Sequence, residues 1–126
     1  MLVLDGGGFT KLSTRSTQSL ALIREFVSCG LWPPVVPTPV LIESLHGHAG
    51  RDANANRFLK VCVSEAAVSV ALARRAAELR RRARTGSAVD ALVVAVAEPG
   101  GTVLTGDSVD LAALAGHADD VAVEVI

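Results

Sequence analysis

The chain of 126 residues suits a single domain spanning residues 1–126 and leaves little room for a second. Half of its residues are hydrophobic and only 3% are aromatic, so we expect a core of Ala, Val and Leu, yet no apolar run reaches the ~18–20 residues that cross a bilayer. The formal net charge of −1 neither favours nor excludes nucleic acid as a partner, but six arginines between Arg74 and Arg84 predict a local basic face.

In the first half of the chain, short apolar runs alternate with segments of helical periodicity. The first run ends at Asp5, and the triple glycine that follows indicates a tight turn. Thr38 as the N-cap and Pro39 as the first helical residue predict the start of a helix. The predicted strands are 2–4, 35–36 and 61–63, and the predicted helices are about 16–29, 38–47 and 53–59.

The second half continues this alternation. A long helix is expected over about 65–84, and its buried stripe comprises Val68, Leu72, Ala76, Leu79 and Ala83. Ser87 is expected to cap a helix over 88–97 that is apolar all round and therefore buried on every side. A strand at 102–104, a short helix at 109–114 and a strand at 121–125 complete the chain. This pattern predicts an α/β fold in which a short parallel sheet is flanked by helices on both faces.

Four acidic residues fall where such a fold binds its ligands. Asp5 and Asp107 follow predicted strands, Asp90 lies in the first turn of a helix, and Glu43 lies one turn into another helix. Ligands of open parallel sheets bind beyond the carboxyl ends of the strands, so we expect these four carboxylates to meet there. They would repel one another unless a divalent cation offset their charge, and oxygen ligands suit Mg²⁺ or Mn²⁺.

Each acid also has a purely structural interpretation. The spacing of Ser87 and Asp90 fits a capping box, and Asp107 and Asp110 have the same spacing. Asp5 could form a turn before the glycines, and Glu43 could be a solvated helix residue. Taken together, four acids at ligand-binding positions favour a common site.

The segments around these acids resemble the motifs of PIN domains, in the same order and at similar spacing. They are Val3-Leu4-Asp5, the run from Val36 to Glu43, the run from Ala88 to Ala95, and the run from Val103 to Leu111. The similarity is closest to the small VapC-type toxins of bacterial toxin–antitoxin pairs and spans nearly the whole chain.

The resemblance implies a PIN-like nuclease domain that acts as a metal-dependent endoribonuclease, a hydrolase of RNA phosphodiesters. Asp5, Glu43, Asp90 and Asp107 then become the catalytic, metal-binding acids, with Mg²⁺ or Mn²⁺ as the cofactor. Thr105 matches a hydroxyl beside the site, and Asp110 is a candidate accessory acid. The implied partners are a cognate antitoxin, the RNA substrate and a second copy in a homodimer.

Gly7 departs from the family pattern, which usually has a small polar residue two places after the first Asp. A hydroxyl that would steady the site is therefore absent. This departure supports an alternative function, a weak or inactive PIN-like domain that binds RNA or protein.

The basic segment allows two interpretations. Arg74, Arg75, Arg81 and Arg82 could bind RNA phosphates near the acidic site. Alternatively, they form a solvated face in which Glu78 pairs with Arg74 and Arg82 at i, i+4 spacing.

A cytoplasmic location is expected. The N-terminus lacks a basic region and its apolar run stops after four residues, unlike a signal peptide. Cys29 and Cys62 lie in apolar surroundings, which indicates reduced, buried thiols and no disulfide framework. We expect no membrane association.

Overall fold

Five short parallel strands form one sheet in the computed structural model, which describes residues 1–126. The strand order is β3-β2-β1-β4-β5, so β1 is central and pairs with β2 and β4. The register places Val3 between Val35 and Val103. The strands are β1 Leu2–Leu4, β2 Val35–Pro37, β3 Val63–Glu65, β4 Thr102–Thr105 and β5 Ala122–Val125.

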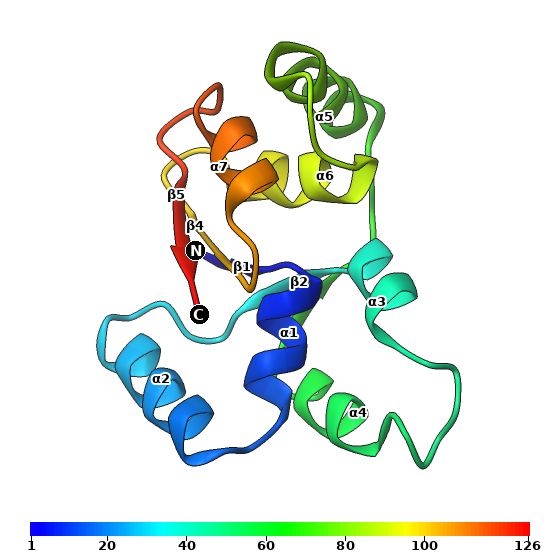
Figure 1. Cartoon of the computed structure of the whole chain (residues 1–126), viewed down its shortest axis with the longest axis vertical. Helices are drawn as coiled ribbons and strands as arrows, with labels where there is room; N and C mark the ends of the chain where they lie inside the picture. The colour runs from blue at the N-terminus through cyan, green and yellow to red at the C-terminus, as the bar shows by residue number, and fades with distance from the viewer.

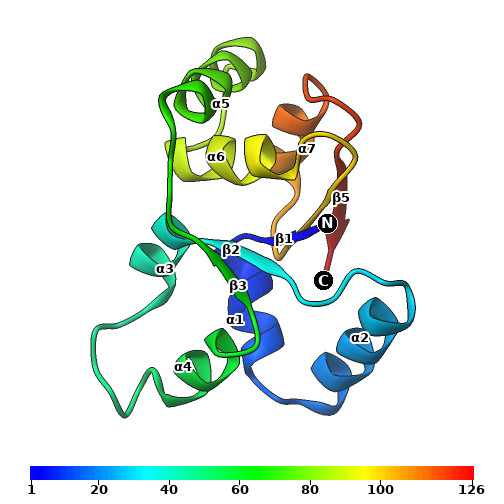
Figure 2. The same ribbon diagram turned by 180° about the vertical axis from the view of Figure 1, so that it is seen from behind.

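Helices cover both faces of this sheet, as Figures 1 and 2 show from opposite sides. Three of them, α5, α6 and α7, lie on one face, and α1, α2, α3 and α4 lie on the other. The α/β fold expected from the alternation of strands and helices is therefore confirmed. The helices are α1 Gly6–Ser13, α2 Thr17–Ser28, α3 Thr38–Ser44, α4 Ala53–Leu59, α5 Val70–Ala83, α6 Ala88–Ala97 and α7 Val109–Ala115. None of them is both long enough and apolar enough to cross a membrane.

The core is one cluster built around β1 and α6. All three residues of β1 are fully buried, and in α6 the run from Ala91 to Ala95 is buried together with Ala97. The uniform apolar composition of α6 predicts this burial correctly, because α6 is packed between the sheet and the helices α5 and α7. Strand β3, at the edge of the sheet, is exposed at every residue.

The main correction concerns the triple glycine, which begins helix α1 and does not form a tight turn. Asp5 is the N-cap of this helix and accepts the Gly8 N–H at 2.7 Å. A Cβ atom on Gly8 would collide with the carbonyl oxygen of Leu104 in β4. The glycines therefore allow α1 to approach the sheet closely, and this contact compensates for their low helix propensity.

Several predicted boundaries are also wrong. The cap of α3 is Pro37 without a side-chain hydrogen bond, and Thr38 is the first helical residue. Strand β3 starts at Val63, two residues after the predicted start at residue 61. The N–H groups of Val61 and Cys62 instead bond to carbonyl groups at the end of α4. Helix α5 starts at Val70, where Ser69 caps it, so Val68 precedes the helix and is 46% exposed.

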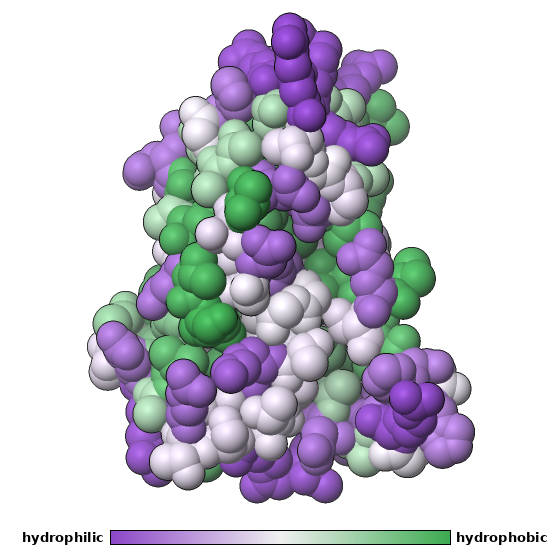
Figure 3. Space-filling view, viewed as in Figure 1, coloured by the Kyte–Doolittle hydropathy of each residue, from purple (hydrophilic) through white to green (hydrophobic).

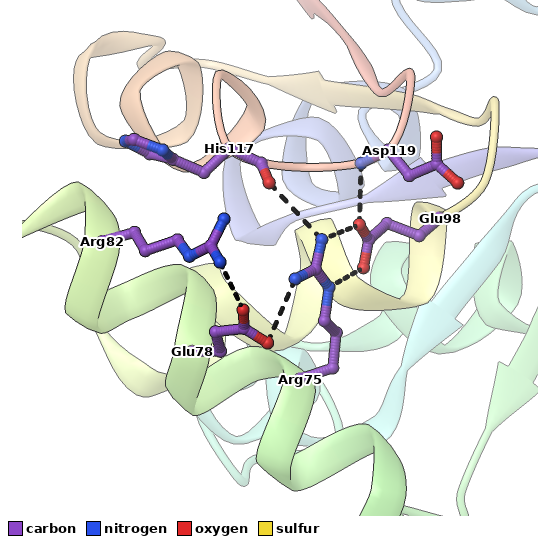
Figure 4. Close-up of polar contacts among 6 residues, drawn as sticks. All are labelled: Arg75, Glu78, Arg82, Glu98, His117 and Asp119. Atoms are coloured by element: carbon purple, nitrogen blue, oxygen red, sulfur yellow. Dashed lines mark hydrogen bonds and ion pairs between the residues drawn. The ribbon is translucent and has the colours of Figure 1, made fainter.

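Arg75 and Glu98 form the strongest polar contact between α5 and the rest of the domain (Figure 4). The Arg75 guanidinium donates to both carboxylate oxygens of Glu98, at 2.8 and 2.7 Å, and Glu98 also accepts the Asp119 N–H. Arg75 additionally pairs with Glu78 at 3.3 Å, and Glu78 pairs with Arg82 at 2.9 Å. The expected Glu78–Arg82 pair is present, whereas Glu78 pairs with Arg75 in place of Arg74. These contacts join α5 to the loops that follow α6 and α7.

Replacing Glu98 with Gln should destabilise the fold at neutral pH by about 2 kcal/mol, because charge-assisted hydrogen bonds would be lost. The Arg75 guanidinium holds the pKa of Glu98 below its ordinary value of 4.5. Ionised Glu98 therefore stabilises the fold above that value, and the contribution disappears as the pH falls through the lowered pKa. Urea unfolding of both proteins from pH 7 to pH 3 measures the difference.

Glu78→Gln, at a more exposed pair, is the control and should cost less than about 0.5 kcal/mol. A pH-independent difference for Glu98→Gln would contradict this account.

Candidate functional site

The carboxyl ends of β1 and β4 meet at the point where the strand order reverses. From β1 the chain continues to β2 and β3 on one side, whereas β4 and β5 lie on the other. Open parallel sheets bind ligands at such a point, because the loops on its two sides diverge to opposite faces. Asp5 follows β1 directly, and its N–H donates to the Leu104 carbonyl of β4 at 3.2 Å.

The Asp5 carboxylate is held by two donors. Its Oδ1 accepts the Gly8 N–H at 2.7 Å, and its Oδ2 accepts the hydroxyl of Thr105 at 2.5 Å. Thr105 is fully buried at the end of β4, so this hydroxyl has little freedom to turn. The structure thus brings Thr105 directly to Asp5, across 100 residues of sequence. The pair fixes the orientation of the carboxylate at the sheet edge.

Burial raises the pKa of Asp5 above its ordinary value of 3.8, and the negative charge of Asp90 raises it further. The hydrogen bonds from Gly8 and Thr105 act in the opposite direction and lower the pKa. No lysine, arginine or histidine forms a salt bridge with Asp5. The half-buried carboxylate therefore carries a negative charge that no neighbouring cation offsets.

Asp90 belongs to the capping box of α6, as its spacing from Ser87 predicts. Its Oδ2 accepts the Ser87 N–H and its own N–H donates to the Ser87 hydroxyl, both at 3.0 Å. These bonds leave Oδ1 of the carboxylate without a donor. The prediction that Asp90 belongs to a capping box is confirmed. In this position, the negative charge of Asp90 also raises the pKa of Asp5.

Asp107 is connected to Asp5 through Thr105. The Thr105 hydroxyl accepts the Asp107 N–H at 3.0 Å and lies 2.8 Å from the Asp107 carbonyl oxygen. The exposed Asp107 side chain accepts the Val109 N–H at 3.2 Å. The residue at the cap position of α7 is Ser108, so the capping box suggested by Asp107 and Asp110 is not formed.

Asp110 points toward the loop between α5 and α6. Its carboxylate accepts the Thr85 hydroxyl at 2.5 Å. This bond joins α7 to the loop that precedes the capping box of α6. The contact gives Asp110 a structural role, because it holds α7 against the loop between α5 and α6.

Glu43 is exposed on α3 and has no salt-bridge or hydrogen-bond partner. Its helix nevertheless lies beside α1, because a Cβ atom on Gly6 would be 3.2 Å from the Ser44 hydroxyl. Across the chain, no group of three or more His, Cys, Asp or Glu side chains is close enough to hold a metal ion. The structure therefore links Asp5, Thr105 and Asp107 by hydrogen bonds, couples Asp90 to Asp5 by charge, and leaves Glu43 apart.

The four predicted acids fit a hard cation in the chemistry of their side chains. Asp5, Asp90, Asp107 and Glu43 offer only oxygen atoms, the ligands that Mg²⁺ and Mn²⁺ prefer. Asp90 has a free oxygen, and the exposed side chains of Asp107 and Glu43 can change rotamer at little cost. A cation would also lower the repulsion between Asp5 and Asp90.

Gly7 is required by packing at this site. A Cβ atom on Gly7 would lie 2.7 Å from the backbone nitrogen of Gly106 and 3.1 Å from its Cα. The small polar residue that the PIN pattern usually has at this position would not fit here without a backbone shift. Thr105 supplies a hydroxyl to Asp5 from the opposite strand. The close approach of Gly106 is the feature of the site that local sequence patterns do not reveal.

The basic segment divides into two faces of α5. Arg75 and Arg82 pair with carboxylates, and these ion pairs account for both residues without RNA. Arg74 and Arg81 have no carboxylate partner, so RNA binding by them stays a prediction. Arg80 and Arg84, which were not among the predicted RNA-binding residues, also form no salt bridge.

In comparisons with known proteins, no protein-family model and no curated protein matches the chain. The functional argument therefore depends on the residues and geometry of the chain itself.

Gly7→Ala should destabilise the protein by about 1–3 kcal/mol, because the added methyl group would overlap the Gly106 backbone. Gly6→Ala is the matched control, since its Cβ would meet only the movable Ser44 hydroxyl and should gain helix propensity. Thermal unfolding of the two variants measures the difference. Equal stabilities would show that the close contact between Gly7 and Gly106 does not constrain the fold.

Asp90→Asn should lower the pKa of Asp5, because it removes a nearby negative charge that raises this pKa. Burial continues to raise the pKa in this variant, and the hydrogen bonds from Gly8 and Thr105 continue to lower it. Carboxyl-carbon NMR during a pH titration measures it. Glu43→Gln is the control and should not move the pKa of Asp5. An unchanged value in Asp90→Asn would place the two carboxylates farther apart than the structure does.

Proposed function

We propose that this protein is a Mg²⁺-dependent endoribonuclease that hydrolyses RNA phosphodiesters and acts as the toxin of a toxin–antitoxin pair. The observation that carries the proposal is the half-buried Asp5 carboxylate at the switch point of the sheet, with Asp90 nearby and no cationic partner. An uncompensated negative charge of this kind costs free energy unless the site binds a cation. The resemblance of the acidic segments to PIN domains supports the same proposed function.

Asp5 and Asp90 are the proposed principal ligands of Mg²⁺ or Mn²⁺, and Asp107 and Glu43 complete the set after a rotamer change. When bound, the ion supplies a Lewis acid that offsets negative charge on the phosphodiester during hydrolysis. Thr105 and the Gly8 N–H orient Asp5, and the hydrogen bond to Ser87 orients Asp90. These bonds reduce the conformational entropy that the two carboxylates lose on binding. Asp110 holds α7 against the loop before α6 and so supports the same edge.

The proposed location, partner and oligomeric state follow from the resemblance to PIN domains. The protein would act in the cytoplasm as a homodimer, and a cognate antitoxin would bind it. An acidic site would attract a basic side chain of an inhibitor, because opposite charges stabilise one another most in a partly buried site.

A binding module without catalytic activity is the second candidate. The observation in its favour is that no three carboxylates are grouped closely enough to hold an ion in the free chain. This candidate predicts no response to divalent ions.

Purified protein should cleave a mixed RNA pool with Mg²⁺ or Mn²⁺ and should not do so with EDTA. Asp5→Asn and Asp90→Asn should each lower the rate by more than about a hundredfold, since even the outer partners of metal ligands contribute factors of 10–100. Gel electrophoresis of the products measures this.

Asp119→Asn, at an exposed carboxylate remote from the sheet edge, is the control and should retain full activity. Circular dichroism of each variant separates loss of activity from loss of folding. Full cleavage by both Asp5→Asn and Asp90→Asn would contradict the assignment of the site. Absence of cleavage by the wild-type protein with either ion would favour the binding module.

A further inference from the structure

An apolar groove of about 350 Å³ lies between α5 and α6, outside the acidic site. Eight of its ten lining residues are hydrophobic, and neither an acidic nor an aromatic residue lines it. Most of its walls are formed by small side chains, which leaves room for larger side chains of a binding partner. Those on the helices include Ala73, Ala76 and Ala77 of α5 and Ala88 and Ala91 of α6.

Unpaired positive charge borders this groove along α5. Arg80 lines the groove, and its Nε donates to the Gly86 carbonyl at 3.1 Å. Arg74 and Arg81 are three residues before and four residues after Ala77, so they flank it on the helix surface. None of these three arginines forms a salt bridge, in contrast to Arg75 and Arg82. Figure 3 shows the strongly hydrophilic surface over α5 at the top of the molecule.

Exposed apolar side chains lie next to the groove. Val68 lines it and is 46% exposed, and Val70 in the first turn of α5 is 68% exposed. Pro39 of α3 also lines it, and Ile42, one turn later in α3, is 82% exposed. The groove is therefore part of a wider apolar surface of the kind that marks binding sites.

We propose that this groove binds an amphipathic acidic helix of a partner protein. Apolar side chains at i, i+3/i+4 and i+7 of that helix would enter the groove between α5 and α6, which is the helix-in-groove mode. Acidic residues beside them would pair with Arg74, Arg80 and Arg81. Charge complementarity identifies this occupant, because the α5 side of the groove is basic and no acidic residue lines the groove.

Two other occupants fit less well. Unpaired RNA bases stack on aromatic side chains, and this groove has none. A second copy arranged with α5 against α5 would bring unpaired arginines together, and like charges in an interface cost affinity. The inference does not depend on nuclease activity, because it uses neither the acidic site nor its metal.

The test uses the full chain and a synthetic helical peptide of about 20 residues with leucines along one face and glutamates on both flanks. Fluorescence anisotropy should show saturable binding that weakens with salt, and amide NMR shifts should map to the groove. A peptide with lysine in place of glutamate is the matched control and should bind at least about tenfold more weakly.

The double variant Arg74→Glu with Arg81→Glu should weaken binding of the acidic peptide by about tenfold or more, without loss of helical structure. Arg24→Glu with Arg51→Glu makes the same change of charge at exposed residues on other elements and should leave binding unchanged. Equal binding by both double variants, or peptide shifts outside the groove, would overturn the proposal.

Two further measurements identify the rival occupants. A dimer in analytical ultracentrifugation that dissociates in Ala77→Asp would show that a second copy covers the groove, and would overturn the proposal. Groove shifts caused by a single-stranded RNA oligonucleotide, with none caused by the acidic peptide, would also overturn it. The expected result is a groove that responds to the acidic peptide alone, and an oligomeric state that Ala77→Asp leaves unchanged.

Discussion

The close packing of α1 on the end of β4 is the contact on which the rest of the site depends. Gly7 and Gly8 have no room for a side chain, because the backbone of Leu104 and Gly106 lies directly against them. Asp5 is the N-cap of α1, so this contact places its carboxylate beside the Thr105 hydroxyl of β4. The glycines lower the intrinsic stability of the helix, and burial of Phe9 and Leu12 on the same helix offsets that cost.

One acidic residue can serve both the fold and a binding site. Asp5 is the N-cap of α1 and Asp90 belongs to the capping box of α6, yet the charge of Asp90 also raises the pKa of Asp5. Desolvation raises the pKa of Asp5 despite two hydrogen bonds, so the chain tolerates an unfavourable charge at this position. Such tolerated electrostatic cost is more common at functional sites than elsewhere, although ion-pair networks can also produce it.

Much of the fold could be predicted from the sequence, because buried parallel strands are short apolar runs and α6 is apolar on every side. Helix α1 could not, since its glycines indicate a turn and its helical form depends on a contact with β4. The positions of Asp5 and Asp107 could also be predicted, because each residue follows a short apolar run that forms a strand. The Thr105 bond to Asp5 and the Arg75 bond to Glu98 join distant segments, which no local pattern reveals. Asp52 is a further example, because this buried carboxylate accepts the N–H groups of His46, Gly47 and His48.

The account centres on a cation at the edge of the sheet beside Asp5 and Asp90. A crystal structure of the protein grown with Mn²⁺, with anomalous diffraction data, tests this most directly. The account predicts an anomalous peak about 2.1 Å from a carboxylate oxygen of Asp5, with Asp90 as a second ligand, and no peak in Asp5→Asn crystals. Wild-type crystals that show no peak at this edge in saturating Mn²⁺ would contradict it.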